Sequence, residues 1–577
     1  MRSSIFLLVH LALFITCFAD AAPPPIESKS DRVDRLFSAW DRPDSPGCAL
    51  GIIDEGKWLY KRGYGMANLE HGIPLTPKSV IRIGSTSKQF TAMAILLLEQ
   101  QGRLSLDDDI RKYLPELPDY GEPIRISNLL HHTSGLRHYL TLMEIQGLRP
   151  RDGATNAEAL AVMARQKALN FSPGERHQSS DTGYFLSSII VERVTQKSLR
   201  EYAQENIFQP LGMKDTHFHD TLNHITRNRA DGYAPLPDGD GYGIDMENTL
   251  DIVGDGGLLT TVEDLFLWDQ NFYKNRLAGG QELMDVFLRP SETDSGERQS
   301  HAAGIFVERY RGLPAVHYSG GWVGFVSYMI QFPTERFSVI CLCNLNDIRP
   351  WHLARGVADI YLQDAFTEPK RFMAQTPKLY VDVPVTRLAS WVGFYENPAR
   401  RQVWRVRLED KSLVAEDDYS RYVLRPLSPS EFHSADTPYV IRFKFEERPG
   451  DGRSILRIEY MGLDYYLVLK HGGKITLEAL DPITVAPTKI EEYLGRYTSD
   501  ELDVTYRLVL EGESLYMRHE NPHRNHFVNE LLPIGKDRFR TPPVIFTFTR
   551  NDRGKITAVT MGDQHYIGAL RLARVPD

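Results

Sequence analysis

Cysteine is scarce in this chain, and the scarcity limits how the fold can be held together. Only four of the 577 residues are cysteine. Three of them, Cys48, Cys341 and Cys343, lie beyond the N-terminal segment, and an odd number leaves at least one thiol free. The sequence therefore predicts a framework that does not depend on disulfides, with Cys341 and Cys343 as small core residues of a strand. No cysteine or histidine spacing resembles a zinc site.

Basic tracts and long hydrophobic runs are also missing. The net charge is −9 at pH 7, and no segment gathers lysine and arginine, which argues against a nucleic-acid partner. The one strongly apolar stretch, residues 5–18, follows Arg2 and precedes the small residues Ala19 and Ala21. This pattern predicts a signal peptide over residues 1–21, with an uncleaved anchor as the alternative. We expect a periplasmic or secreted protein with no stable membrane span after signal removal.

Hydrophobic periodicity divides the rest of the chain into zones. From residue 31 to residue 366, helical and strand patterns alternate, and strands at both ends of this zone enclose a helical middle. This arrangement predicts one sheet built from distant segments, with an all-helical lobe inserted. The expected elements are a hairpin over 48–61, helices over 85–102, 157–168, 181–195, 262–271 and 351–366, and strands over 301–309, 323–332 and 337–343. A linker is expected over 367–384.

The last zone contains an internal repeat. Short strands and turns replace helical periodicity, and similar segments recur at a spacing of about 100 residues. Trp391-Val392-Gly393-Phe394-Tyr395 is matched by Tyr493-Leu494-Gly495-Arg496-Tyr497, and Phe443-Lys444-Phe445 by Phe546-Thr547-Phe548. Two copies of a short-stranded antiparallel unit predict two small lipocalin-like β-barrels, over 385–480 and 488–577. A single sandwich with accidental likeness is the alternative.

A serine and a lysine three residues apart are the strongest chemical signal. Ser85 and Lys88 share one face at the start of an apolar helix. Burial would remove the preference of the Lys88 amine for its charged form and make it a usable base. The helix start favours negative charge that develops at Ser85. This layout is typical of a hydrolase that forms an acyl-enzyme, although the spacing alone also occurs by chance.

Several runs around this pair, taken in order, resemble the serine β-lactamase and penicillin-binding superfamily, on its class C and D-aminopeptidase side. They are Pro46-Gly47-Cys48-Ala49, Gly63-Tyr64-Gly65-Met66-Ala67-Asn68, the Ser85 block, His131-His132-Thr133-Ser134-Gly135-Leu136 and Phe171-Ser172-Pro173-Gly174. The resemblance covers a little over half of the chain. It implies an α/β (α+β) domain over 31–366, with a sheet flanked by helices, an all-helical lobe and the site between them.

The resemblance also implies a second motif, normally Tyr-x-Asn. Pro173-Gly174 and Gly183-Tyr184 set its register on Ser179-Ser180-Asp181, so Ser179 replaces the tyrosine and Asp181 the asparagine. A proton relay through the Ser179 hydroxyl is expected, because class A relatives carry serine there. Loss of the relay is the alternative, since a hydroxyl reaches less far than a phenol.

The third motif of the superfamily is a strand, usually Lys-Thr-Gly or His-x-Gly. The register set by Gly324 and Phe325 assigns it to Tyr318-Ser319-Gly320-Gly321, with His317 one residue upstream. Successive strand residues point to opposite faces, so only one of His317 and Tyr318 can face the site in a regular strand. We expect Tyr318 to do so.

These motifs together imply acyl transfer through a serine ester. Lys88 would take the Ser85 proton, the N–H groups of Ser85 and Gly321 would hold the oxyanion, and no metal or organic cofactor would be needed. The superfamily architecture favours a peptidase or amidase on short peptides with D-residues. A carboxylesterase, a β-lactamase-type hydrolase and a binding protein with impaired catalysis are the alternatives. Oligomeric state stays open.

The second barrel repeat is longer than the first near residues 521–526. This polar turn is too long for a tight hairpin, and long loops on rigid barrels are often functional. In D-aminopeptidase-like proteins a barrel loop narrows the site, so the resemblance implies that this turn reaches the hydrolase cleft and limits substrates to short ones. A solvated surface loop is the alternative.

Overall fold

The computed structural model describes most of the chain. The described residues are 27–148, 153–221, 223–237, 239–245, 252–368, 380–397, 402–417, 420–434, 440–447, 454–461, 474–480, 487–521, 524, 530–541, 544–562 and 567–576. The expected signal peptide and most of the 521–526 turn lie outside them. Within this part of the chain, no helix combines the length and the apolar character needed to cross a bilayer.

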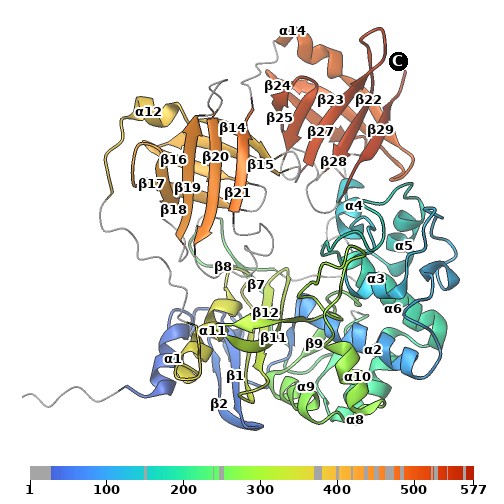
Figure 1. Ribbon diagram of the computed structural model, residues 1–577, viewed down its shortest axis with the longest axis vertical. Helices are drawn as coiled ribbons and strands as arrows, with labels where there is room; N and C mark the ends of the chain where they lie inside the picture. The colour runs from blue at the N-terminus through green and yellow to red at the C-terminus, as the bar shows by residue number, and fades with distance from the viewer. Residues whose placement is uncertain are drawn as a thin grey trace, which may run out of the picture.

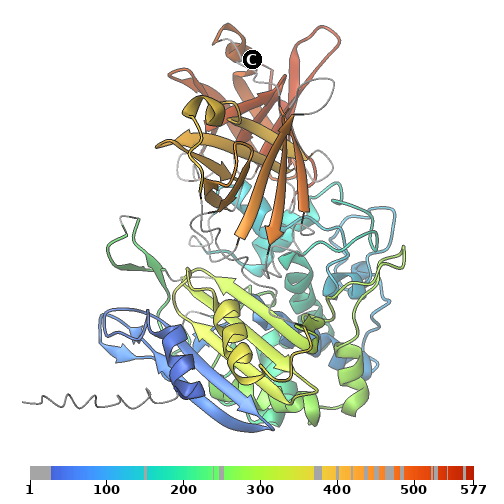
Figure 2. The ribbon, with the colours of Figure 1, turned by 60° about the vertical axis from the view of Figure 1, so that its left-hand side comes forward.

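A six-stranded antiparallel sheet forms the base of the molecule. Its strand order is β10-β11-β12-β13-β1-β2, so strands from the two ends of the hydrolase zone meet in its middle. Helices α1 and α11 lie together on one face (Figures 1 and 2), and α9 contacts β1 and β13. The expected sheet from distant segments is confirmed. The bounds are β1 Cys48–Asp54, β2 Lys57–Tyr64, β10 Phe306–Tyr310, β11 Leu313–Trp322, β12 Phe325–Phe332, β13 Phe337–Cys343, α1 Lys29–Phe37, α9 Val262–Tyr273 and α11 Pro350–Tyr361.

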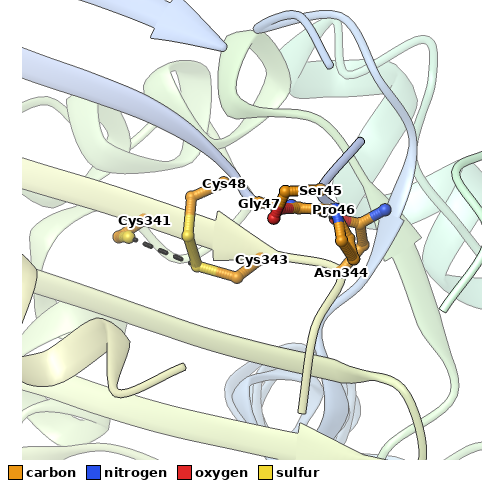
Figure 3. Close-up of a disulfide and its surroundings, with 7 residues drawn as sticks. All are labelled: Ser45, Pro46, Gly47, Cys48, Cys341, Cys343 and Asn344. Atoms are coloured by element: carbon orange, nitrogen blue, oxygen red, sulfur yellow. Dashed lines mark hydrogen bonds between the residues drawn. A yellow bond between two sulfur atoms is a disulfide. The ribbon is translucent and has the colours of Figure 1, made fainter. Parts of the chain in front are cut away.

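The centre of this sheet carries a disulfide that the sequence did not predict. Cys48 on β1 and Cys343 on β13 lie directly opposite each other and are bonded (Figure 3). The expectation of a framework without disulfides, with Cys343 only a small core residue, is therefore wrong. Two cysteines 295 residues apart are joined because β1 and β13 pair. Cys341 is the free, buried thiol, with its Sγ 3.7 Å from that of Cys343.

Helices between the two halves of the sheet form the helical lobe. Every residue of α2 from Lys88 to Leu98 is buried, so this helix is a core element rather than an amphipathic surface helix. Helix α6 packs against α2, α3 and α4. The bounds are α2 Lys88–Gln100, α3 Ile126–Leu130, α4 Tyr139–Ile145, α5 Asn156–Ala164, α6 Asp181–Thr195, α7 Leu199–Ala203, α8 Gln209–Leu211 and α10 Gly280–Phe287. Short helical turns η1 Gly84–Ser87, η2 Ile110–Lys112 and η4 Gln204–Phe208 link them, and short strands β3 Met66–Asn68, β4 Ile73–Pro74, β5 Ile81–Arg82, β6 His217–Phe218, β7 Tyr233–Pro235, β8 Tyr242–Ile244 and β9 Leu258–Thr260 complete the domain.

Two closed antiparallel barrels follow, each of eight strands in chain order. The same hydrogen bond occurs in both: the Tyr395 hydroxyl donates to the Trp391 carbonyl, and the Tyr497 hydroxyl to the Tyr493 carbonyl, each at 2.9 Å. The predicted pair of barrels is confirmed. Barrel 1 contains β14 Gly393–Asn397, β15 Gln402–Glu409, β16 Ser412–Glu416, β17 Arg421–Pro426, β18 Glu431–Ser434, β19 Val440–Glu447, β20 Ser454–Met461 and β21 Lys474–Ala479, after α12 Val385–Ala389. Barrel 2 contains β22 Gly495–Ser499, β23 Val504–Glu511, β24 Ser514–His519, β25 Glu530–Gly535, β26 Arg538–Thr541, β27 Val544–Arg550, β28 Ile556–Gly562 and β29 Leu570–Arg574, after α14 Pro487–Ile490 and η6 Glu491–Tyr493.

Barrel 2 is docked on the helical lobe, near α4 and α5 (Figure 1). Apolar side chains of barrel 2 and of the lobe belong to one continuous core cluster. Arg137, nearly fully buried, forms an ion pair with Glu501 at 2.7 Å and donates to the Ala569 carbonyl at 2.5 Å. Gln146 donates to the Leu502 carbonyl at 2.5 Å. Barrel 2 therefore buries part of the surface of the helical lobe, around Arg137 and Gln146.

Candidate active site

The segment that carries Ser85 runs from strand β5 through the turn η1 into α2. Gly84 has a φ of +52°, and a Cβ there would lie 2.6 Å from the Gly321 nitrogen. A Cβ on Gly320 would lie 1.9 Å from the Ile83 carbonyl oxygen. Glycine at both positions therefore lets β11 approach the turn that carries Ser85 closely. This approach brings the Gly321 backbone to the same cleft as Ser85.

Lys88 is the centre of a tight polar network. Its Nζ donates to Ser85 Oγ at 2.8 Å, to Asp181 Oδ1 at 2.6 Å and to the Asp255 carbonyl oxygen at 2.8 Å. The Lys88 residue is 1 % exposed. An ammonium group has three N–H donors, and these three acceptors use all of them. The structure thus brings Ser85, Lys88 and Asp181 into direct contact.

The charge of Lys88 differs from the sequence-based expectation. Burial lowers the pKa of Lys88, but the nearby Asp181 carboxylate, with contributions from Tyr318 and Asp255, raises it above its ordinary value overall. The prediction of a neutral Lys88 is therefore wrong for the free protein, because a counter-ion offsets the cost of burying the cation. Lys88 is an ammonium ion at neutral pH.

Asp181 holds this ammonium from the first turn of α6. Ser180 caps that helix, since its side chain accepts from the Thr182 N–H. The second carboxylate oxygen of Asp181 lies 3.0 Å from His138 Nε2. Burial raises the pKa of Asp181, but the Lys88 charge and the His138 contact lower it well below its usual range overall. Asp181 is thus a permanent anion, where the second motif usually has an uncharged asparagine.

Ser179 lies away from this network. Its side chain is exposed, and it is not among the residues that line the cleft beside Ser85. The structure brings Asp181 to the site and leaves Ser179 at its edge.

The third motif occupies the end of β11 as a regular strand. The pairing of β11 with β10 and with β12 shows no register shift, so His317 and Tyr318 point to opposite faces. Tyr318 belongs to the core cluster on the side of α2, and it contributes to raising the pKa of Lys88. His317 contacts Glu308 Oε1 at 2.7 Å. Alternation puts the half-buried Ser319 on the His317 face, and of the motif residues 318–321 only Gly321 lines the cleft.

The cleft itself lies between the end of β11 and helices α4 and α6. It has a water-accessible volume of about 30 Å³ and is lined by Arg82, Ser85, Tyr139, Asp181, Ile252, Asp255, Gly256, Gly321 and Trp322. Arg82 donates to the Gly256 carbonyl oxygen at 3.1 Å, and its guanidinium lies 5.9 Å from the Trp322 ring centre. The cleft is thus narrow and carries charges of both signs.

Sequence analysis missed Tyr139 and Asp255 among these lining residues. Asp255 is the acidic residue in the run Gly254-Asp255-Gly256-Gly257, and an acid among glycines is a signal that could have pointed to it. Tyr139 is the third residue after the His131–Leu136 run and carries no signal of its own. Both reach the cleft through folding of distant segments.

Three histidine rings cluster together, of which His132 and His301 are buried and His177 is half-buried. The rings of His132, His177 and His301 have centres 4.6 to 5.6 Å apart. Burial, with smaller contributions from neighbouring positive charge, lowers the pKa of each, to about 4 for His177. These imidazoles are therefore neutral at pH 7 and add no like charge beside the Lys88 ammonium.

Comparison with known proteins gives consistent matches. The family described as beta-lactamase matches residues 33–359. Penicillin-binding protein 4* of Bacillus subtilis is 28 % identical over 392 residues, covering 64 % of this chain and 83 % of that protein. Protein flp of Staphylococcus aureus is 29 % identical over 307 residues, covering 52 % of this chain and 60 % of that protein. The octameric penicillin-binding protein homologue from Pyrococcus abyssi has a similar fold, with a TM-score of 0.52 and 22 % identity over 78 % of this chain and 99 % of that one.

Proposed function

The chain belongs to the beta-lactamase family, and on this premise we propose that it is a secreted serine hydrolase acting through an acyl-enzyme on Ser85. The observation that carries the proposal is the 2.8 Å contact between Ser85 Oγ and the buried Lys88 ammonium. A cation at this distance lowers the energy of a serine oxygen as it gains negative charge. The Ser85 hydroxyl also opens into the cleft.

The proposed substrates are short peptides or amides that contain D-residues. The cleft is small, with a water-accessible volume of about 30 Å³, which favours small acyl donors. Penicillin-binding protein 4*, the relative 28 % identical, is named for binding penicillin, which is a cyclic amide with a D-configured centre. The Gly321 N–H at the cleft edge is available as an oxyanion donor together with that of Ser85. The apolar part of Trp322 would contact the substrate.

A substrate panel tests this proposal. The purified chain is given a D-amino-acid anilide, a nitrophenyl ester and a chromogenic cephalosporin, with Ser85→Ala as the background for each. The proposal predicts turnover of the anilide that Ser85→Ala abolishes. Turnover of the ester alone would indicate a carboxylesterase, and turnover of the cephalosporin would indicate a β-lactamase-type hydrolase. Anilide turnover that survives Ser85→Ala would contradict the assignment of the nucleophile.

A second candidate is a binding protein that keeps the fold but turns substrates over poorly. The charge of Lys88 favours it, because an ammonium cannot accept the Ser85 proton. This candidate predicts a stable acyl adduct on Ser85 with no release of product over hours. The proposed hydrolase predicts release at a measurable rate.

A further inference from the structure

Within the described part of the chain, Lys88 donates a hydrogen bond to Ser85 Oγ and does not accept the Ser85 proton. Lys88 is protonated, and its three N–H donors already serve Ser85 Oγ, Asp181 and the Asp255 carbonyl. For Ser85 to attack a carbonyl, its own proton must move to another group. Ser179, which would relay the proton in the expected scheme, is exposed and outside the cleft lining.

The cleft contains a second acid–base pair beside Ser85. The Tyr139 hydroxyl donates to Asp255 Oδ2 at 2.7 Å, and both residues line the cleft. Tyr139 is 1 % and Asp255 is 7 % exposed, so their geometry is held by packing. The Asp255 carbonyl shares the Lys88 ammonium with Ser85 Oγ, each at 2.8 Å. Tyr139 is the first residue of α4.

Resting on the proposed hydrolase function, we propose that Tyr139 and Asp255 form the proton path of this enzyme, in place of the tyrosine that the second motif lacks. As Ser85 Oγ bonds to the carbonyl carbon, its proton passes to the Tyr139 oxygen, and the Tyr139 proton passes to Asp255 Oδ2. When the carbon–nitrogen bond breaks, Tyr139 gives its proton to the leaving nitrogen and regains the one on Asp255. Water then attacks the acyl carbon, its proton follows the same path, and Ser85 Oγ regains a proton as it leaves.

The electrostatics of Asp255 suit a base that works near neutral pH. Burial, and next to it the negative charge of Asp181, raises the pKa of Asp255 to about 6, although Lys88 partly opposes the shift. At pH 7 the group is therefore mostly a carboxylate, yet it accepts a proton far more readily than an exposed aspartate. Below pH 6 it is protonated and cannot serve. With Asp255 as the base, the role of Lys88 in this mechanism is that of an ammonium that stabilises the Ser85 oxygen.

The rate at which a fluorophosphonate labels Ser85, measured from pH 5 to pH 9, tests the proposal without requiring a known substrate. The wild-type rate should fall as the pH drops through about 6. Tyr139→Phe, which keeps the ring, should label at least about 100-fold more slowly at pH 7. Asp255→Asn should also be slow, and its rate should no longer change near pH 6. Tyr202→Phe, which alters a buried tyrosine outside the cleft lining, should label at the wild-type rate.

Leaving-group dependence separates this role from a structural one. An anilide needs a proton on its leaving nitrogen and a nitrophenyl ester does not, so Tyr139→Phe should slow the anilide about tenfold more than the ester. A wild-type labelling rate in Tyr139→Phe would overturn the proposal, as would a rate loss found only in Ser179→Ala. Either result leaves the hydrolase proposal intact, whereas labelling that persists in Ser85→Ala overturns both.

Discussion

At the scale of single residues, this chain has Asp181 where the second motif usually has asparagine, and this difference changes the chemistry of the site. An asparagine would remove the largest charge that opposes the effect of burial on Lys88, and the Lys88 pKa would fall. The Asp181 carboxylate at 2.6 Å reverses this and keeps the lysine charged. The identity of this residue could be read from the sequence, but its consequence could not, because it depends on a contact between residues 93 positions apart.

The variant Asp181→Asn tests this account. Removing the carboxylate should lower the Lys88 pKa, so Lys88 loses its proton at a lower pH than in the wild type. Because Lys88 is expected to work as an ammonium, the alkaline fall of kcat/KM should move to lower pH by at least one unit. Glu263, which pairs with Lys61 in an exposed ion pair, offers the control Glu263→Gln, whose profile should match the wild type. A higher neutral rate in Asp181→Asn would instead indicate that Lys88 is the base.

At the scale of elements, prediction succeeded where periodicity was strong. The bounds of α6 and β13 match the expected segments 181–195 and 337–343, and α9 extends its expected segment by two residues. Errors arose where packing decides the ends: β10 starts at Phe306 rather than at 301, and α11 ends at Tyr361 rather than at 366. Tyr139 and Asp255 were missed because neither belongs to a periodic pattern or to a motif of the resemblance.

The pairing of β1 with β13 makes a prediction about the disulfide. Cys48 and Cys343 close a loop of 295 residues, and loss of such a cross-link typically costs about 2–5 kcal/mol of unfolding free energy. Cys343→Ala should therefore lower the urea midpoint of the hydrolase domain. Cys341→Ala removes the free thiol on the same strand and should cost about 1 kcal/mol or less. Equal losses in the two variants would show that the cross-link does not contribute.

At the scale of the whole molecule, barrel 2 and the helical lobe form one packed unit. The main chain between α3 and α4 connects the two: Arg137 pairs with Glu501 of barrel 2, and the next residue, His138, contacts Asp181. Arg524 of the expected long turn lies against Gly147, beside the end of α4. The two barrels could be predicted from their repeat. Their docking could not, because Arg137 and Glu501 carry no pattern that links them.

The Arg137–Glu501 pair offers a test of this docking. Arg137 is nearly fully buried, so Glu501→Gln would leave its charge without a counter-ion, at a cost of about 3–5 kcal/mol. Urea unfolding of the full chain should show that loss. The neighbouring pair Lys167–Asp500 is exposed and 3.7 Å apart, so Asp500→Asn should cost less than about 1 kcal/mol. Similar midpoints for the two variants would mean that the buried pair does not hold barrel 2 on the lobe.

The most direct test of the central claim is the site of covalent modification. The full chain is treated with a fluorophosphonate, digested, and analysed by mass spectrometry beside Ser85→Ala. The account predicts one adduct, on the peptide that carries Ser85, and none in the variant. An adduct on another residue, or one that forms equally in Ser85→Ala, would contradict the claim that Ser85 is the nucleophile of this protein.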